Sequence, residues 1–222
     1  MKTNLINYPH TKEVDHYDTY HGVSVADPYR WLEDDKSPET ADWIERQNKE
    51  TYKYLETIPF RENLKKRLKE LNNYEKIGSP FKRGKYEYFY KNSGLQNHSI
   101  LYRRPVGTTE NEEVFLDPNQ FSNDGTVALR GIYFSEDYSK AAYMITEGGS
   151  DWRKAITIEV ESKKIIEDTV KNIKFSGLSW KKNEGFYYSS YDLPTDKRIA
   201  SPAARVIAGP ASIVRVEALA AY

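Results

Sequence analysis

A repeat of about 46 residues restricts the fold of this chain more than any other feature of its sequence. One copy begins at Gly131–Asp137 and leads into Ala142–Tyr143. The next begins 46 positions later, at Gly177–Asn183, and leads into Phe186–Tyr188. A looser, earlier copy begins at Pro80–Gly84. Each copy joins a turn-forming stretch to an aromatic strand, so the repeat predicts a series of similar hairpin-built units.

A four-stranded unit that recurs every ~40–50 residues is typical of β-propeller blades. Two full copies and the start of a third are too few to close a ring. Because a blade buries its faces only against neighbouring blades, we expect a partial propeller over residues 77–198. Its uncovered sheet edges and faces would favour self-association of the chain.

The residue pattern between 77 and 191 also supports a mainly β fold. Polar and apolar residues alternate at Lys85–Tyr90 and at Ala155–Val160, with the period of a strand. The 18 tyrosines favour half-buried pleated surfaces as well. Shorter strands are predicted at Ser99–Arg103, Val114–Leu116, Ala141–Ile145, Lys164–Ile166 and Phe186–Ser189.

Residues 1–76 have a different pattern, which predicts loops followed by two helices. Ser37 is expected to cap the first helix, with Pro38 at its first position. That helix should end at Pro59, which breaks the pattern. The second helix is expected to carry one apolar stripe, made of Phe60, Leu64, Leu68 and Leu71.

Residues 199–222 differ in composition from the rest of the chain. Eight of these 24 residues are alanine, none is lysine, and Glu217 is the single acid. We interpret the stretch as the product of a frameshift, a readthrough or an appended tail. The alternative is a genuine strand or helix of unusual composition.

Charge and cysteine content exclude several classes of function. The 33 basic residues balance 33 acidic ones, so we expect no nucleic-acid partner and no anionic membrane surface. The absence of cysteine excludes disulfides, thiolate zinc sites and a thiol nucleophile. No phosphate-binding loop or His-Glu-x-x-His motif is present, so no cofactor or metal is expected. Without an apolar leader or a spanning segment, the expected location is the cytoplasm.

Short motifs between residues 7 and 191 form one ordered series. In chain order they are Tyr8–Pro9, Tyr20–Val23, Asp27–Asp35, Ser37–Thr40, Gln47–Asn48, Ile58–Arg61, Gly94–Asn97, Leu116–Asn119, Phe134–Asp137, Gly149–Trp152, Lys174–Gly177 and Phe186–Ser189. This series closely resembles the N-terminal part of the prolyl oligopeptidase family of serine peptidases. The segment Gly94–Asn97 favours the prolyl enzymes over the related oligopeptidase B.

The resemblance implies a two-domain endopeptidase that cleaves short peptides after proline. In the family, the N-terminal segment and the C-terminal half of the chain form an α/β-hydrolase domain. A seven-bladed propeller inserted between them admits only small peptides. Residues 1–76 would be the N-terminal arm of the hydrolase domain, and residues 77–198 the first two blades and the start of a third. Residues 199–222 would be a tail outside the family.

This chain departs from the family pattern in two places. The family usually has glycine in the hairpin after Phe134–Asp137, where this chain has Tyr138, so the turn must differ or be strained. The resemblance stops near Arg198, before the remaining blades and the catalytic half.

No catalytic residue is expected in this chain. A serine hydrolase of this fold needs a Gly-x-Ser-x-Gly elbow. Ser150 and Ser179 each follow the first glycine of such an elbow but lack the second. The group His16, Asp18 and His21 lacks metal-ligand spacing, which favours surface or capping roles.

Two residues are candidates for other functional contacts. Phe175 matches a propeller aromatic that reaches the substrate pocket in the family, and its alternative role is that of an inner-strand core residue. Asp151 resembles a family position near the interdomain face, with polar pairing or a turn role as alternatives.

We therefore hypothesise an N-terminal fragment of a prolyl oligopeptidase, inactive alone, whose complete enzyme acts on short proline-containing peptides. The alternative hypothesis is a non-catalytic propeller-type binding module.

Overall fold

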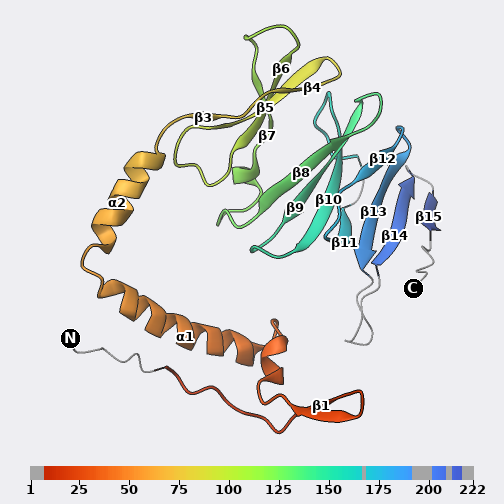
Figure 1. The fold of residues 1–222 in the computed structure, drawn as a ribbon. Coiled ribbons are helices and arrows are strands. Elements are labelled where there is room, and N and C mark those ends of the chain that lie inside the picture. The colour runs from red at the N-terminus through yellow and green to blue at the C-terminus, as the bar shows by residue number, and fades with distance from the viewer. Residues whose placement is uncertain (1–7, 167–168, 192–201, 209–211, 217–222) are drawn as a thin grey trace. The chain divides into compact units, whose positions relative to one another are not determined.

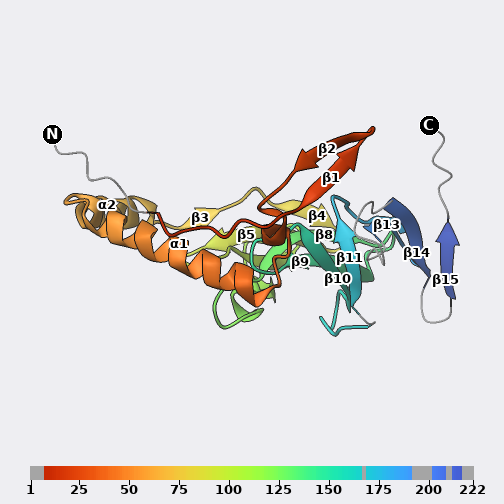
Figure 2. The ribbon, with the colours of Figure 1, turned by 90° about the horizontal axis from the view of Figure 1, so that it is seen from below.

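The computed structural model of the chain describes residues 8–166, 169–191, 202–208 and 212–216. By its internal contacts the chain divides into two compact units, Met1–Leu71 and Asn72–Tyr222. The first contains a hairpin and helices, and the second is built of strands (Figures 1 and 2). The predicted mainly β fold with N-terminal helices is confirmed.

The first unit begins with a hairpin that the sequence pattern did not predict. Strand β1 (Tyr17–Tyr20) pairs antiparallel with β2 (Val23–Ala26). His21 and Gly22 join them with φ angles of 50° and 82°, as a two-residue turn with two left-handed residues requires. A short helix, η1 (Arg30–Glu33), follows.

The two predicted helices are confirmed. Helix α1 spans Pro38–Glu56, and the Ser37 hydroxyl accepts hydrogen bonds from the backbone N–H groups of its first turn, as predicted. Helix α2 spans Arg61–Asn72. No helix among the described residues is long and apolar enough to cross a membrane. The predicted apolar stripe of the second helix is largely exposed, at Phe60, Leu64, Leu68 and Leu71.

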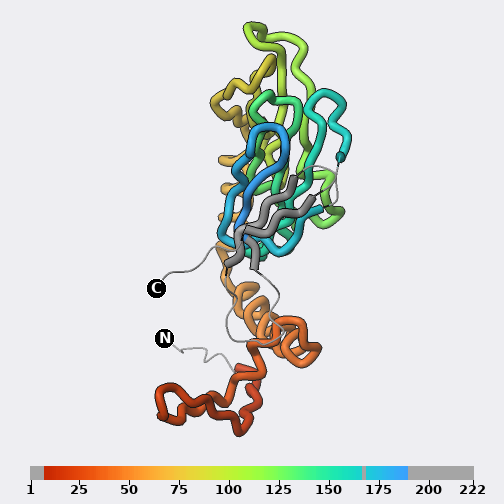
Figure 3. Tube along the Cα trace, turned by 90° about the vertical axis from the view of Figure 1, so that its right-hand side faces the viewer, coloured from red at the N-terminus to blue at the C-terminus, as the bar shows by residue number. Residues whose placement is uncertain are grey.

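The second unit consists of successive antiparallel meanders, as the repeat predicts (Figure 3). In the first meander the opening strand is split into two pieces that both pair with the next strand. Its elements are β3 (Lys76–Ile77), β4 (Phe81–Arg83), β5 (Tyr86–Asn92), β6 (Ile100–Pro105) and β7 (Glu113–Leu116). The short helix η2 (Pro118–Gln120) follows it.

The next two meanders are joined into one eight-stranded sheet through the backbone pair Ile173–Ser190. The second meander contains β8 (Ala128–Phe134), β9 (Lys140–Thr146), β10 (Trp152–Glu159) and β11 (Val170–Lys174). The third contains β12 (Ser179–Lys181), β13 (Gly185–Tyr191), β14 (Pro202–Ala208) and β15 (Ser212–Val216).

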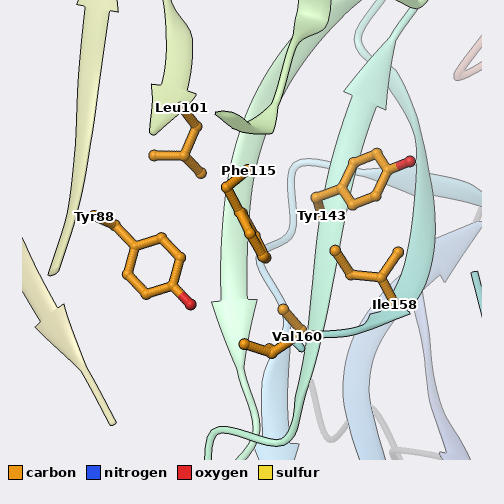
Figure 4. Packing of buried hydrophobic residues seen from close by; sticks show 7 residues of the cluster. Tyr88, Leu101, Phe115, Tyr143, Ile158 and Val160 are labelled. Atoms are coloured by element: carbon orange, nitrogen blue, oxygen red, sulfur yellow. The ribbon is translucent and has the colours of Figure 1, made fainter. Parts of the chain in front are cut away.

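The second meander packs against a neighbour on each face. Successive side chains of a strand point to opposite sides, so one strand can contribute to two clusters. On β9, Ala141 and Tyr143 face a cluster shared with the first meander (Figure 4). Ala142 and Met144 face a cluster shared with the third. The first cluster also contains Tyr88, Leu101, Phe115, Ile158 and Val160, and the second Ala155, Ile173, Leu178, Phe186 and Tyr188. Burial raises the pKa of Tyr88 to about 12.

A buried arginine connects the first meander to the second. Arg103 on β6 is 2% exposed. Its guanidinium donates hydrogen bonds to the backbone oxygens of Val160 and Glu161, beyond the end of β10. It also donates from Nε to the Glu113 carboxylate on β7, at 2.6 Å. One side chain therefore satisfies acceptors from both meanders.

Aromatic rings and a second cation surround this arginine. The Arg103 guanidinium lies 4.3 Å from the ring centroid of Tyr86 and 5.0 Å from that of Phe115, within the range of cation–π attraction. Lys163 also donates to Glu113, at 2.9 Å. The hydrogen bonds from Lys163 and Arg103 hold the pKa of Glu113 below its usual value, although partial burial opposes them.

Equivalent turns of the repeat contact each other directly. The N–H of Asp137 donates to the side-chain oxygen of Asn183 at 3.0 Å, and that of Glu136 donates to the backbone oxygen of Lys182 at 3.3 Å. Both pairs are 46 positions apart, the period of the repeat. The equivalent turns of the second and third meanders therefore lie side by side.

The predicted strain at Tyr138 is confirmed, since its φ is 61° in the left-handed region. The Asp137 carboxylate supports the turn by accepting from the N–H and hydroxyl of Ser139 and from the Ser135 hydroxyl. These bonds, first that from the Ser139 N–H, lower the pKa of Asp137. A Cβ on Gly84 would lie 3.1 Å from the Tyr138 Cβ, so the side chain packs closely over a bare backbone position.

Two strand predictions differ from the structure. The predicted strand Lys164–Ile166 is wrong, because within it Ile165 makes an isolated bridge with Ile158 and β11 begins only at Val170. In the stretch 199–222, the structure has strands β14 and β15, and β14 pairs with β13. The strands at 202–208 and 212–216 agree with the alternative interpretation of this stretch, that it forms a genuine strand.

Candidate functional site

The second meander brings both sequence-predicted site residues to the same end of its sheet. Strands β10 and β11 are neighbours in the sheet (Figure 1). Strand β10 begins at Trp152 and β11 ends at Lys174, and these two residues are directly paired. Asp151 immediately precedes Trp152, and Phe175 immediately follows Lys174. Asp151 and Phe175 are therefore each adjacent in sequence to one member of the same cross-strand pair.

Phe175 is 69% exposed and has a φ of 51°, in the left-handed region. Its exposure in this chain is inconsistent with the alternative of an inner-strand core residue. An exposed ring gains little from packing here, and a left-handed non-glycine residue costs free energy. Such strain is frequent at binding sites, where the backbone aims a side chain outward.

Lys174 lies between two aromatic rings. Its ammonium is 5.1 Å from the ring centroid of Trp152 and 5.0 Å from that of Phe175. Both distances are within the range of cation–π attraction. Trp152 itself is 38% exposed, so this arrangement is open to solvent. In the described part of the chain, Lys174 makes no ion pair with a carboxylate.

Asp151 lies in the turn between β9 and β10. The turn uses left-handed backbone at Gly148 and Gly149, with φ angles of 58° and 75°. The Ser150 hydroxyl accepts the N–H of Trp152 at 3.1 Å, which closes the turn. The exposed Asp151 carboxylate takes no part in these bonds and remains available to other groups.

The segment after Phe175 is held by hydrogen bonds from two strands. Arg153 on β10 donates from Nη1 to the backbone oxygen of Ser176 at 3.1 Å. The Ser176 hydroxyl accepts the N–H of Ser189 on β13 at 2.9 Å. The Arg153 Nε is buried and has no hydrogen-bond partner within the described ranges. These contacts fix the backbone from which Phe175 projects.

Sequence reasoning did not single out Lys174 or Arg153. Their importance depends on the pairing of β10 with β11, and β11 was not predicted. A usable signal is that the matching segments Gly149–Trp152 and Lys174–Gly177 each place an aromatic beside a charged residue.

The histidines show no arrangement of hydrolase or metal type within the described ranges. The His98 ring nitrogen lies 2.9 Å from the backbone oxygen of Gly125, and no described histidine ring is bonded to a serine hydroxyl. His16 is 3.5 Å from Asp18, whose carboxylate is also bound by Arg30. No group of three His, Asp or Glu residues among those described is placed to hold a metal.

Comparison with known proteins identifies the family. The family model "Prolyl oligopeptidase, N-terminal beta-propeller domain" matches residues 9–206. Prolyl endopeptidase from Elizabethkingia miricola is 52% identical over 202 residues, which cover 90% of this chain and 28% of that protein. Prolyl oligopeptidase A from Amanita bisporigera is 33% identical over 211 residues, which cover 83% of this chain and 28% of that protein.

Solved structures agree with the sequence matches. A chain from a study of two prolyl endopeptidases matches with a TM-score of 0.78 at 33% identity, covering 95% of this chain and 32% of its own length. Prolyl oligopeptidase B from Galerina marginata, bound to a 35mer hydrolysis and macrocyclization substrate, matches with a TM-score of 0.70 at 28% identity, covering 92% of this chain and 32% of its own. This chain spans 28% of the length of the two curated relatives. It belongs to the prolyl oligopeptidase family, of which it represents an N-terminal portion.

Proposed function

We propose that this chain is the N-terminal part of a serine endopeptidase that cleaves short peptides after proline. The observation that carries the proposal is the 52% identity to a prolyl endopeptidase over 90% of the chain. The described residues contain no serine–histidine pair, so the chain alone would be inactive. Catalysis would require the hydrolase part that the resemblance to the family implies.

In this proposal the meanders from residue 77 onward are propeller blades that limit access to small peptides. Residues 1–76 are the N-terminal arm of the hydrolase domain. The 69% exposed ring of Phe175 packs against a substrate side chain near the proline, and the exposed Asp151 lies at the face towards the hydrolase domain. Both residues are at one end of one sheet, which supports a common surface for substrate and catalytic domain.

A chimera tests the proposed function. Residues 9–191 of this chain replace the matching segment of the Elizabethkingia miricola enzyme, and release of a chromophore from a Gly-Pro-linked reporter is measured. We expect cleavage by the chimera and no release above buffer by the 222-residue chain alone. In the chimera, Phe175→Ala should raise KM about tenfold with little change in kcat, because the ring binds substrate away from the reacting bond.

The matched control for this variant is Ile165→Ala. Ile165 is 65% exposed, nearly as much as Phe175, but lies in the connection before β11, away from the paired end of β10 and β11. The KM of the chimera that carries Ile165→Ala should stay unchanged. A folded but inactive chimera would contradict the proposed function and leave the non-catalytic binding module. If the two variants change KM equally, Phe175 does not bind the substrate.

We also propose that the isolated chain self-associates. Phe60, immediately before α2, is 63% exposed, and Leu64 on α2 is 51% exposed, so an apolar stripe faces solvent here. Such stripes usually have a partner, which the hydrolase domain would supply in the complete enzyme. Light scattering after size exclusion should show dimers or larger species, and Leu64→Lys should shift them towards monomer. A monomer at every concentration of the unmodified chain would contradict this proposal.

A further inference from the structure

Charge is unevenly distributed at the end of the sheet formed by β10 and β11. Lys174 and Arg153 bring two positive charges to it, and Asp151 brings one negative charge. The neighbouring Lys154 is already neutralised, because it forms an ion pair with Glu147 at 2.5 Å. Among the side chains that the structure describes, this end of the sheet therefore has an excess of positive charge.

The two cations are held differently. Arg153 is committed to the backbone, since Nη1 donates to the oxygen of Ser176 at 3.1 Å. Among the described residues, Lys174 has only the ring faces of Trp152 and Phe175 beside its ammonium, at 5.1 and 5.0 Å. Ring faces attract a cation but leave its net charge uncompensated and its N–H groups without an acceptor. The ammonium is thus positioned and remains able to donate.

We infer that Lys174 is a specificity-determining residue that binds a carboxylate of the peptide whose side chain packs on Phe175. The inference rests on the proposed function, because it assigns the substrate class of the same surface. A lysine placed by two rings loses less side-chain freedom on forming an ion pair than a free one does. The ligand class is a proline-containing peptide with a carboxylate, from an acidic side chain or from its C-terminus.

Peptide binding to the full 222-residue chain tests this without any catalysis. Three forms of one short proline-containing peptide are compared, which differ in one side chain and in whether the C-terminus is amidated or free. One carries glutamate with an amidated end, one carries glutamine with a free C-terminal carboxylate, and one carries glutamine with an amidated end. Binding is followed through tryptophan fluorescence, because Trp152 adjoins the Lys174 ammonium.

At least one carboxylate form should bind about fivefold more tightly than the neutral form, and the preference should weaken with added salt. The form that gains affinity identifies the source of the carboxylate. Lys174→Met should abolish the preference while weak binding of the neutral peptide remains, and Lys174→Arg should keep it. Lys171→Met removes the same charge from the same strand and should leave the preference unchanged.

Equal binding of all three peptides, or no binding of any at millimolar concentration, overturns the inference. So does a preference that survives Lys174→Met or is lost equally in Lys171→Met. None of these outcomes depends on turnover by the chimera. Failure of the chimera to cleave its reporter would instead refute the proposed function, so the two failures are distinguishable.

Discussion

Replacing Arg103 with methionine should lower the free energy of unfolding by about 3 kcal/mol. Methionine retains an apolar stem between the rings of Tyr86 and Phe115 but removes the guanidinium. The backbone oxygens of Val160 and Glu161 would then lose their donor at the junction of two meanders. An acceptor left without a partner in a buried place costs more than a typical hydrogen bond contributes.

Urea unfolding measures the effect as a shift of the midpoint. The control is Arg104→Met, one position along β6, where the arginine pairs with Glu87 at 3.2 Å and its side chain is 22% exposed. A pair of that kind contributes about 1 kcal/mol or less. Similar midpoints for the two variants would show that Arg103 does not connect the meanders.

Replacing Phe186 with alanine should destabilise the chain by about 3–4 kcal/mol. Phe186 is 1% exposed and packs edge-on against Trp180, with ring centroids 5.4 Å apart. Truncation removes its buried surface and leaves a cavity that the surrounding strands fill only in part. Because Phe186 lies in the cluster shared by the second and third meanders, both should lose stability together.

Thermal unfolding followed by circular dichroism tests this second effect. Tyr187→Ala is the matched control, since the next residue on β13 points to the opposite face and is 39% exposed. Its loss should cost about 1 kcal/mol or less. If the Tyr187 variant melts as low as the Phe186 variant, the burial of the second cluster is not what stabilises the sheet.

Patterns that depend on local chemistry were predictable from the sequence. The cap at Ser37 and the alternation along Lys85–Tyr90 and Ala155–Val160 correspond to α1, β5 and β10. The strained turn at Tyr138 followed from the resemblance, because the family usually has glycine at that place in the hairpin. Each of these features is determined within a few residues of the chain.

Features that depend on pairing across the chain were not predictable. The strands of the β1–β2 hairpin have mostly exposed side chains. They therefore have no buried face that a sequence pattern could reveal. Strand β11 pairs irregularly with β10, with a register shift between Arg153 and Ala155, which hides its period. The site was therefore only half visible. Phe175 and Asp151 could be named from the sequence, but Lys174, whose ammonium lies beside the rings of Trp152 and Phe175, could not.

The in-register turns offer a simple account of how such an array grows. The side chain of Asn183 bonds to the turn that lies one repeat earlier, at Asp137. The gene segment that encodes the third copy therefore also encodes one means of attaching its product to the preceding copy. Duplication of that segment would extend the protein without requiring a new contact between turns to evolve, whereas a single-residue insertion in one turn would break that contact.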